Sequence, residues 1–243
     1  MSDSLEHDQV PFGKRLFYAF FIPVLFVLAM WAVKGFEWVF DTSFYRWGVF
    51  PRRQEGLAGV FLYPFLHQDL KHLFGNTIPM LFLGGSLFFF YRSIALNVFF
   101  WLYLASGIWL WTAGRPSWHI GASGMVYALS FFLFLSGVWR GHPRLMALSL
   151  IVVFLYGSLI WGLFPIEPHM SYEGHLTGAL AGGVIAWFYR KKGPQKTVVE
   201  WKEEEDSEEE EDTFHDDDPP TPPPAPSQMK IVYTIVEGKK GEG

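Results

Sequence analysis

Six stretches of the chain are apolar for long enough to cross a membrane as helices. A helix needs about 20 mostly apolar residues to span the ~30 Å hydrocarbon core of a bilayer. The pattern therefore predicts an all-α, polytopic membrane protein, a bundle of six transmembrane helices. The predicted spans are residues 15–33, 72–91, 94–111, 121–139, 144–163 and 174–190.

The spans divide the chain into three parts. Residues 1–14 form a short N-terminal segment, and residues 15–192 hold the six-helix core. Residues 193–243 differ in character, with 13 carboxylates in 200–218 followed by five prolines in 219–225. Such a composition cannot bury a core, so we expect a disordered tail. Its closing MKIVYTIVEG alternates like a strand but is too short to fold without a partner.

Two other segments carry expectations about the membrane. The first span follows an acidic N-terminus and lacks a small-residue cleavage site, so we expect it to remain as a helix and not to be removed as a secretion signal. The long connection 34–71 contains aromatic residues, Pro51 and several glycines. We expect it to fold onto the bundle or to dip into the membrane interface.

Composition and charge exclude several classes of function. Half of the residues are apolar and 19% are aromatic, and the net charge of −5 combines a basic core with an acidic tail. The basic residues flank the spans, which indicates topology and not nucleic-acid binding. The chain has no cysteine, so disulfides, Cys-ligated zinc and a thiol nucleophile are excluded. We expect no metal and no cofactor.

Lysine and arginine predict the orientation. They favour the cytoplasmic flanks of spans, and those in the long loop 34–71 count for less. With both termini in the cytoplasm, nine of them lie inside and six outside. We therefore expect cytoplasmic termini and a multi-pass protein of a plasma (inner) membrane. The nine are Lys14, Arg15, Arg92, Arg140, Arg144, Arg190, Lys191, Lys192 and Lys196.

Polar groups open three of the spans. Such groups are costly inside a membrane, so each marks a candidate site. The second span opens KHLFGNTIPM, where His72 and Asn76 share one helical face. The fourth opens GASGMVYAL, with Ser123 in the first turn, where backbone N–H groups lack helical partners. The sixth opens EGHLTGALAGG and carries His175. In the six-helix topology all three openings lie on the non-cytoplasmic side.

These residue types suit nucleophilic catalysis. A serine hydroxyl needs a neutral imidazole to take its proton, and His175 is the candidate base. His72, Asn76 and the Ser123 amide would face the developing oxyanion. No Asp or Glu lies in the predicted spans to orient His175, so we expect a dyad. Tyr127, one turn after Ser123, can stack on the imidazole.

Small residues predict how these helices approach each other. Gly174, Gly178 and Gly182 follow at intervals of four, and Gly124 with Ala128 offers a matching face. Such small-xxx-small faces allow close helix contact.

Each polar residue also has a plainer interpretation. Ser123 alone is a small residue that eases helix contact, and a single histidine at a helix end is an interfacial residue. The joint pattern favours function, because packing does not require four such groups at one depth. His67 is predicted to be structural. His119 and His169 fall in outside loops and receive no role.

Together the motifs resemble the rhomboid family of intramembrane serine proteases over residues 12–192. The resemblance implies that Ser123 is the nucleophile, His175 the general base, and His72 and Asn76 oxyanion donors. It also implies membrane-protein substrates, single-span or polytopic, and a fifth span that acts as a lateral gate. The matching motifs are HxxxN (His72, Asn76), GxSG with its following tyrosine (Gly121, Ser123, Gly124, Tyr127) and HxxGxxxG (His175, Gly178, Gly182).

One family feature is absent, and two other functions compete. Many rhomboids carry a Trp-Arg pair where this chain has Ala58-Gly59. A catalytically silent rhomboid-like protein that binds membrane clients for quality control would be expected to lack Ser123 or His175, and both are present. A small transporter would need discontinuous helices and paired ionisable residues at the bilayer midplane. We expect membrane lipids and membrane-protein substrates as partners, and no nucleic acid.

Overall fold

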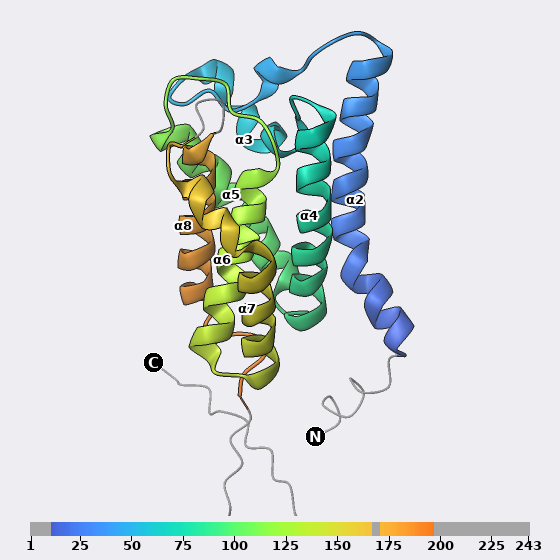
Figure 1. Ribbon diagram of the computed structural model, residues 1–243, viewed down its shortest axis with the longest axis vertical. Coiled ribbons are helices and arrows are strands. Elements are labelled where there is room, and N and C mark those ends of the chain that lie inside the picture. Colours follow the sequence, from blue (N-terminus) through green and yellow to red (C-terminus); the bar gives the residue numbers. More distant parts are fainter. Residues whose placement is uncertain (1–10, 167–170, 197–243) are drawn as a thin grey trace, which may run out of the picture. The chain divides into compact units, whose positions relative to one another are not determined.

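The computed structural model describes residues 11–166 and 171–196, and within these ranges it is helical without a strand (Figure 1). The predicted disorder and the strand-like end of the tail lie outside the described residues, as does His169. All the described residues belong to one compact unit.

Each predicted span overlaps one helix, except 144–163, which covers an α-helix and the 3-10 helix that follows it. Five helices are long and apolar enough to cross a membrane, counting α7 and η4 together as one. The sixth, α8, has 17 residues, a length of roughly 25 Å at the usual helical rise. The count of six spans therefore stays a prediction. The main helices are α2 (Phe12–Val39), α4 (Leu70–Phe90), α5 (Ala95–Ala113), α6 (Ser123–Arg140), α7 (Pro143–Tyr156), η4 (Gly157–Leu163) and α8 (Tyr172–Phe188).

Helix α2 continues past the predicted end at residue 33. Lys34 forms an ion pair with Glu37 across 3.0 Å, and the other carboxylate oxygen of Glu37 accepts a hydrogen bond from the Phe44 amide at 2.6 Å. These contacts satisfy the charges of the last two turns. Lys34 also donates to the carbonyl oxygens of His67 and Gln68, each at 3.0 Å, which ties α2 to the segment before α4.

Helix α6 is the centre of the bundle. In its most apolar window 67% of the residues are buried, against 22% to 44% in the other candidate spans. It packs against α4, α5, α7 and α8, and Figure 1 shows α6 among these helices. Ser123 is the first residue of α6, so it belongs to the most buried of the candidate spans.

The contact between α6 and α8 is made through the predicted glycines. A Cβ atom on Gly178 would overlap the carbonyl oxygen of Gly124, and one on Gly182 would overlap that of Ala128. The two backbones therefore touch with no side chain between them, as the small-xxx-small spacing predicts.

The segment between α2 and α4 folds onto the bundle, as expected. It contains η1 (Tyr45–Trp47), η2 (Gln54–Gly56), α3 (Gly59–Leu62) and η3 (Tyr63–Phe65). It is anchored to α5 by a 2.8 Å hydrogen bond between the hydroxyls of Tyr63 and Ser106 and by a 3.0 Å bond from Trp111 to the carbonyl of Arg53. Gly59, at the place of the missing Trp-Arg pair, lies so close to the backbone of Gly48 that a side chain would not fit.

The glycine contact predicts a stability effect. Gly178→Ala should destabilise the fold by about 1–3 kcal/mol through overpacking against Gly124, although alanine favours helix more than glycine does. Gly183→Ala is the matched control on the same helix, because its Cβ would meet only the end of the Leu135 side chain, at 3.3 Å. Thermal unfolding in detergent, followed by circular dichroism, measures both. An unchanged Gly178→Ala midpoint would contradict the close approach.

Candidate functional site

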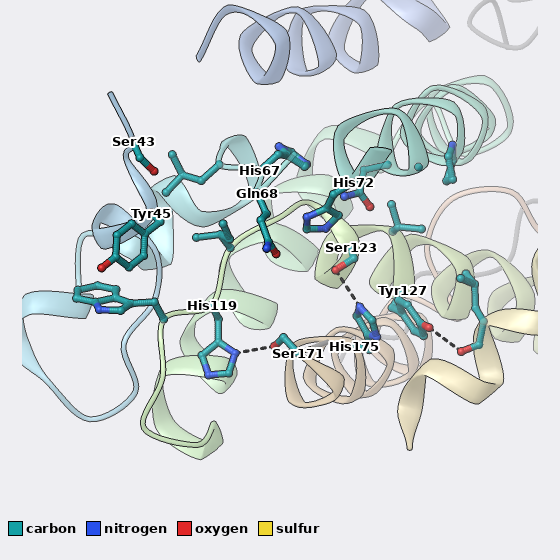
Figure 2. Close-up of a pocket in the computed structure, with 18 of the residues that line it drawn as sticks. Ser43, Tyr45, His67, Gln68, His72, His119, Ser123, Tyr127, Ser171 and His175 are labelled. Carbon is teal, nitrogen blue, oxygen red and sulfur yellow. Dashed lines mark hydrogen bonds between the residues drawn. The ribbon is translucent and has the colours of Figure 1, made fainter. Parts of the chain in front are cut away.

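Ser123 and His175 lie side by side in a cavity of about 820 Å³ near one end of the bundle. The Ser123 hydroxyl is 2.9 Å from Nε2 of His175 (Figure 2). His72, Asn76 and Tyr127 line the same cavity. The structure thus brings together side chains from α4, α6 and α8 that lie up to about a hundred residues apart along the chain.

The His175 ring is held in one orientation by its other nitrogen. Nδ1 lies 2.9 Å from the carbonyl oxygen of Gly162. A carbonyl can only accept, so Nδ1 carries the ring proton and donates it. Nε2 is then left with a lone pair directed at the Ser123 hydroxyl, as a general base requires.

Tyr127 supports the same ring from its face. The two rings are stacked, with centroids 4.2 Å apart and an interplanar angle of 7°. The Tyr127 hydroxyl donates a 2.7 Å hydrogen bond to the carbonyl of Leu159. Both carbonyls that hold this pair, those of Leu159 and Gly162, come from η4.

Sequence reasoning missed Gly162. A Cβ at this position would overlap the Tyr127 hydroxyl and lie 3.1 Å from Nδ1 of His175, so glycine lets η4 approach both side chains. A single glycine near the end of an apolar span carries no signal of this role, because the contact is set by how η4 packs against α6 and α8.

The α6 N-terminus adds a backbone donor. Ala122, the residue before the helix, makes no side-chain cap, and the first N–H groups of a helix have no partner inside it. The Ser123 amide therefore points out of the helix end, next to its own hydroxyl.

His72 and Asn76 approach from α4. Asp69 caps α4 by accepting a 2.8 Å hydrogen bond from the His72 amide. The His72 ring packs against Gly121, whose backbone φ of +109° and lack of space both require glycine. The Asn76 side chain is buried, and its Nδ2 has no hydrogen-bond partner among the described residues. An unpaired buried donor in the cavity that Ser123 lines could donate to an acceptor oxygen of a bound molecule.

His67 links the segment before α4 to the loop before Ser123. Its Nε2 accepts a 3.4 Å hydrogen bond from the Ala122 amide, and its ring centroid is 5.0 Å from that of His72. Burial, helped by the nearby His72, lowers the pKa of His67 to about 3. The ring is therefore neutral at physiological pH and remains a hydrogen-bond acceptor.

The described ranges contain no group of three or more His, Asp or Glu side chains placed to hold a metal ion.

Comparison with known proteins places these residues in a family. A sequence model of the rhomboid domain matches residues 54–192, more than half of the chain. An uncharacterized protein of Mycobacterium tuberculosis is 34% identical over 153 residues, which cover 58% of this chain and 62% of the relative. One from Mycobacterium leprae is 32% identical over 158 residues, with 60% and 61% covered. The Rhomboid-related protein 1 of Caenorhabditis elegans is 31% identical over 129 residues, with 49% and 36% covered.

The matched region therefore spans about 60% of the length of the mycobacterial relatives. The rhomboid-domain match, residues 54–192, contains Ser123, His175, His72 and Asn76.

The neutral His67 predicts a specific acid sensitivity. The folded-state pKa lies below the ordinary value, so the stabilising contribution is complete above about pH 6.5 and is lost as the pH falls toward 3. Between pH 7 and 5 this amounts to as much as roughly 2 kcal/mol. His67→Gln keeps an acceptor but cannot titrate, so its stability should fall less over that range. His142→Gln, at the opposite end of the bundle, should keep the wild-type sensitivity in thermal unfolding at both pH values.

Proposed function

Because the chain belongs to the rhomboid family, we propose that it is an intramembrane serine endopeptidase that cleaves transmembrane segments of other membrane proteins through Ser123 and His175. The chain is an integral membrane protein, with several helices apolar enough to span a bilayer. The observation that carries the proposal is the 2.9 Å contact between the Ser123 hydroxyl and an imidazole whose other nitrogen is already occupied.

Acylation is the first half of the reaction. His175 takes the proton of Ser123 as the hydroxyl oxygen attacks the scissile carbonyl. The resulting tetrahedral intermediate carries its negative charge on the former carbonyl oxygen. The imidazolium of His175 then gives the proton to the leaving amine, and the acyl group stays on Ser123.

Deacylation reverses these roles with water as the nucleophile. His175 removes a proton from the water, which attacks the ester carbon, and Ser123 regains its proton as the acyl chain leaves. The cavity lining includes Gln68, His72 and Ser171 besides the dyad. This polar lining offers water a route that a lipid-filled cleft would not.

The oxyanion is assigned to three donors. These are the side-chain amide of Asn76, the His72 ring and the backbone amide of Ser123. The unpaired Nδ2 of Asn76 supports this assignment, because its desolvation cost is offset only when an acceptor arrives.

We propose that the site lies on the outer side of the membrane, with both termini in the cytoplasm. Arg140 and Arg144 flank the turn between α6 and α7, and Arg190, Lys191 and Lys192 follow α8. This basic end lies opposite the helix openings that carry the dyad, in agreement with the preference of basic residues for the cytoplasm.

Substrate entry is assigned to the side of α7. In the span formed by α7 and η4, only 22% of the residues in the most apolar stretch are buried, which is the lowest share among the candidate spans. A substrate helix protects its own peptide bonds by hydrogen bonding, so we expect substrates whose helices unwind easily near the outer leaflet.

Covalent labelling tests the nucleophile. The detergent-solubilised protein should react with a fluorophosphonate probe, and Ser123→Ala should abolish the reaction. Ser130→Ala, which changes a buried serine of the same helix, is the matched control and should still be labelled. Labelling that survives the loss of Ser123 would remove it as the nucleophile.

Cleavage of a model transmembrane substrate separates a protease from a client-binding protein. Wild type should cleave it, and His175→Ala should not, while both still bind the substrate. Binding without cleavage by wild type would favour the silent client-binding function.

Asn76 is predicted to act on the transition state. Asn76→Ala should lower kcat about 10²–10³-fold with little change in KM, because an oxyanion donor acts mainly after the ground state. Steady-state kinetics on the same substrate measure kcat and KM separately. A rise in KM alone would assign Asn76 to substrate binding instead.

A further inference from the structure

A second serine–histidine pair lies in the same cavity, between His119 and Ser171. Nδ1 of His119 is 2.6 Å from the Ser171 hydroxyl (Figure 2). His119 precedes α6, and Ser171 precedes α8. The sequence analysis assigned His119 no role and did not single out Ser171, because nothing in a loop residue and a helix-start residue indicates that they meet.

The bonds of His119 fix the direction of this contact. Its Nε2 lies 3.1 Å from the carbonyl oxygen of Arg115 and 3.3 Å from the Ser117 hydroxyl. Since the carbonyl can only accept, Nε2 carries the proton and Nδ1 accepts from Ser171. Burial lowers the pKa of His119, and its side chain is only 2% exposed. The ring is therefore neutral and keeps its acceptor.

Ser171 is not arranged as a second nucleophile. It is the N-cap of α8, and its hydroxyl oxygen accepts a 3.2 Å hydrogen bond from the Gly174 amide. Its carbonyl accepts from the His175 amide at 3.3 Å. The hydroxyl thus donates to His119 and accepts from α8, so it joins the two elements.

His119 is itself anchored to the outer loop. Its backbone exchanges two hydrogen bonds with Val49, of 2.8 and 3.0 Å. Two residues later, the Gly121 amide donates to the carbonyl of Tyr63 at 2.8 Å. The loop before Ser123 is therefore held on one side by the outer segment and on the other by Ser171.

The positions of the two pairs along the chain match. Ser123 follows His119 by four residues, and His175 follows Ser171 by four residues. A contact fixed at His119 and Ser171 thus fixes the starting points of the two elements that carry the dyad.

We propose that His119 and Ser171 form a positioning pair that sets the separation between the Ser123 hydroxyl and the His175 imidazole. This inference rests on the proposed protease function, since it concerns the geometry of that dyad. Neither residue touches the reacting atoms. A misplacement of about 1 Å in reacting groups costs on the order of 10²-fold in rate, so a small shift of the loop is enough to be measured.

A neighbouring ion pair keeps the loop near α8 when the positioning pair is broken. Arg115 lies 3.4 Å from the carboxylate of Glu173, which is in the first turn of α8. Substitution of His119 should therefore leave the fold in place while the dyad loses its precise separation.

Two substitutions of His119 test the proposal. His119→Phe keeps a ring of similar size and removes the acceptor. His119→Asn offers a side-chain oxygen near the position of Nδ1 and restores the acceptor. Ser117→Ala is the control, because it removes a hydroxyl beside His119 and leaves the contact with Ser171 intact.

The readouts are the rate of fluorophosphonate labelling of Ser123, kcat and KM on a model transmembrane substrate, and the unfolding midpoint. His119→Phe should lower kcat and the labelling rate about 10- to 100-fold with KM nearly unchanged. His119→Asn should recover most of that loss, and Ser117→Ala should behave as wild type. Adding Ser171→Ala to His119→Phe should lower kcat little further, because the two residues act through one contact.

The outcomes separate this inference from the proposed function. If wild type is not labelled at Ser123, the protease proposal fails. If wild type is labelled and His119→Phe reacts at the same rate, only the positioning pair is overturned. Equal losses in the phenylalanine and asparagine variants, or losses that merely follow the unfolding midpoint, would also overturn it and leave His119 a packing residue.

Discussion

The backbones of α6 and α8 touch each other, and the position of Ser123 relative to His175 depends on that contact. Between helices in a bilayer the hydrophobic effect offers little, since lipid tails are as apolar as leucine side chains. Close packing of small residues and hydrogen bonding must hold the helices instead. At Gly178 and Gly182 a single added carbon would overlap a carbonyl oxygen of α6. The approach of Ser123 to His175 therefore follows from glycines one to two turns further along α8.

A backbone carbonyl occupies the place that a carboxylate takes in a triad. The Gly162 carbonyl accepts from Nδ1 of His175, and this fixes the tautomer. Burying a charged carboxylate carries a desolvation cost that a neutral carbonyl avoids. Under the proposed function, the carbonyl would stabilise an imidazolium at His175 less than a full negative charge would. The stacked ring of Tyr127 shares the task of holding the imidazole in place.

The parts of the fold that sequence predicts are those encoded by local spacing. His72 and Asn76 share a helical face, and the glycines of α8 recur every four residues, so both patterns can be read without knowing what they pack against. The five candidate spans follow from length and composition in the same way. The end of α2 was misplaced because a hydropathy pattern stops at Lys34, while the ion pair with Glu37 lets the helix continue.

The contacts that sequence did not reveal join segments far apart in the chain. Gly162 meets His175 and Tyr127, Ser171 meets His119, and His67 meets the Ala122 amide. Each partner is an ordinary loop or helix-end residue by itself. Their pairing depends on where η4 and the outer loop settle against the bundle, and a single sequence contains no pattern that fixes this.

Helices α6 and α8 are attached to each other at both ends, whereas α7 is attached to the bundle along one face. Helices α6 and α8 are joined at their far end as well, where the buried Arg140 donates to the hydroxyl of Ser136 at 2.9 Å and to the carbonyl of Tyr189 at 2.6 Å. Helix α7 is attached to α6 by a hydrogen bond from the hydroxyl of Ser149 to the carbonyl of Phe134 at 2.9 Å, and its buried Leu145, Leu148 and Val152 belong to the apolar core.

Beyond Ser149 the outward side chains of α7 face lipid, with Leu150 71% and Phe154 88% exposed. A hinge near Ser149 would thus let the outer end of α7 swing while α6 and α8 stay together. That motion would carry η4 with it, and η4 supplies the carbonyl that orients His175. Under the proposed function, a movement of α7 that admitted a substrate would therefore also disturb the contact between His175 and the Gly162 carbonyl.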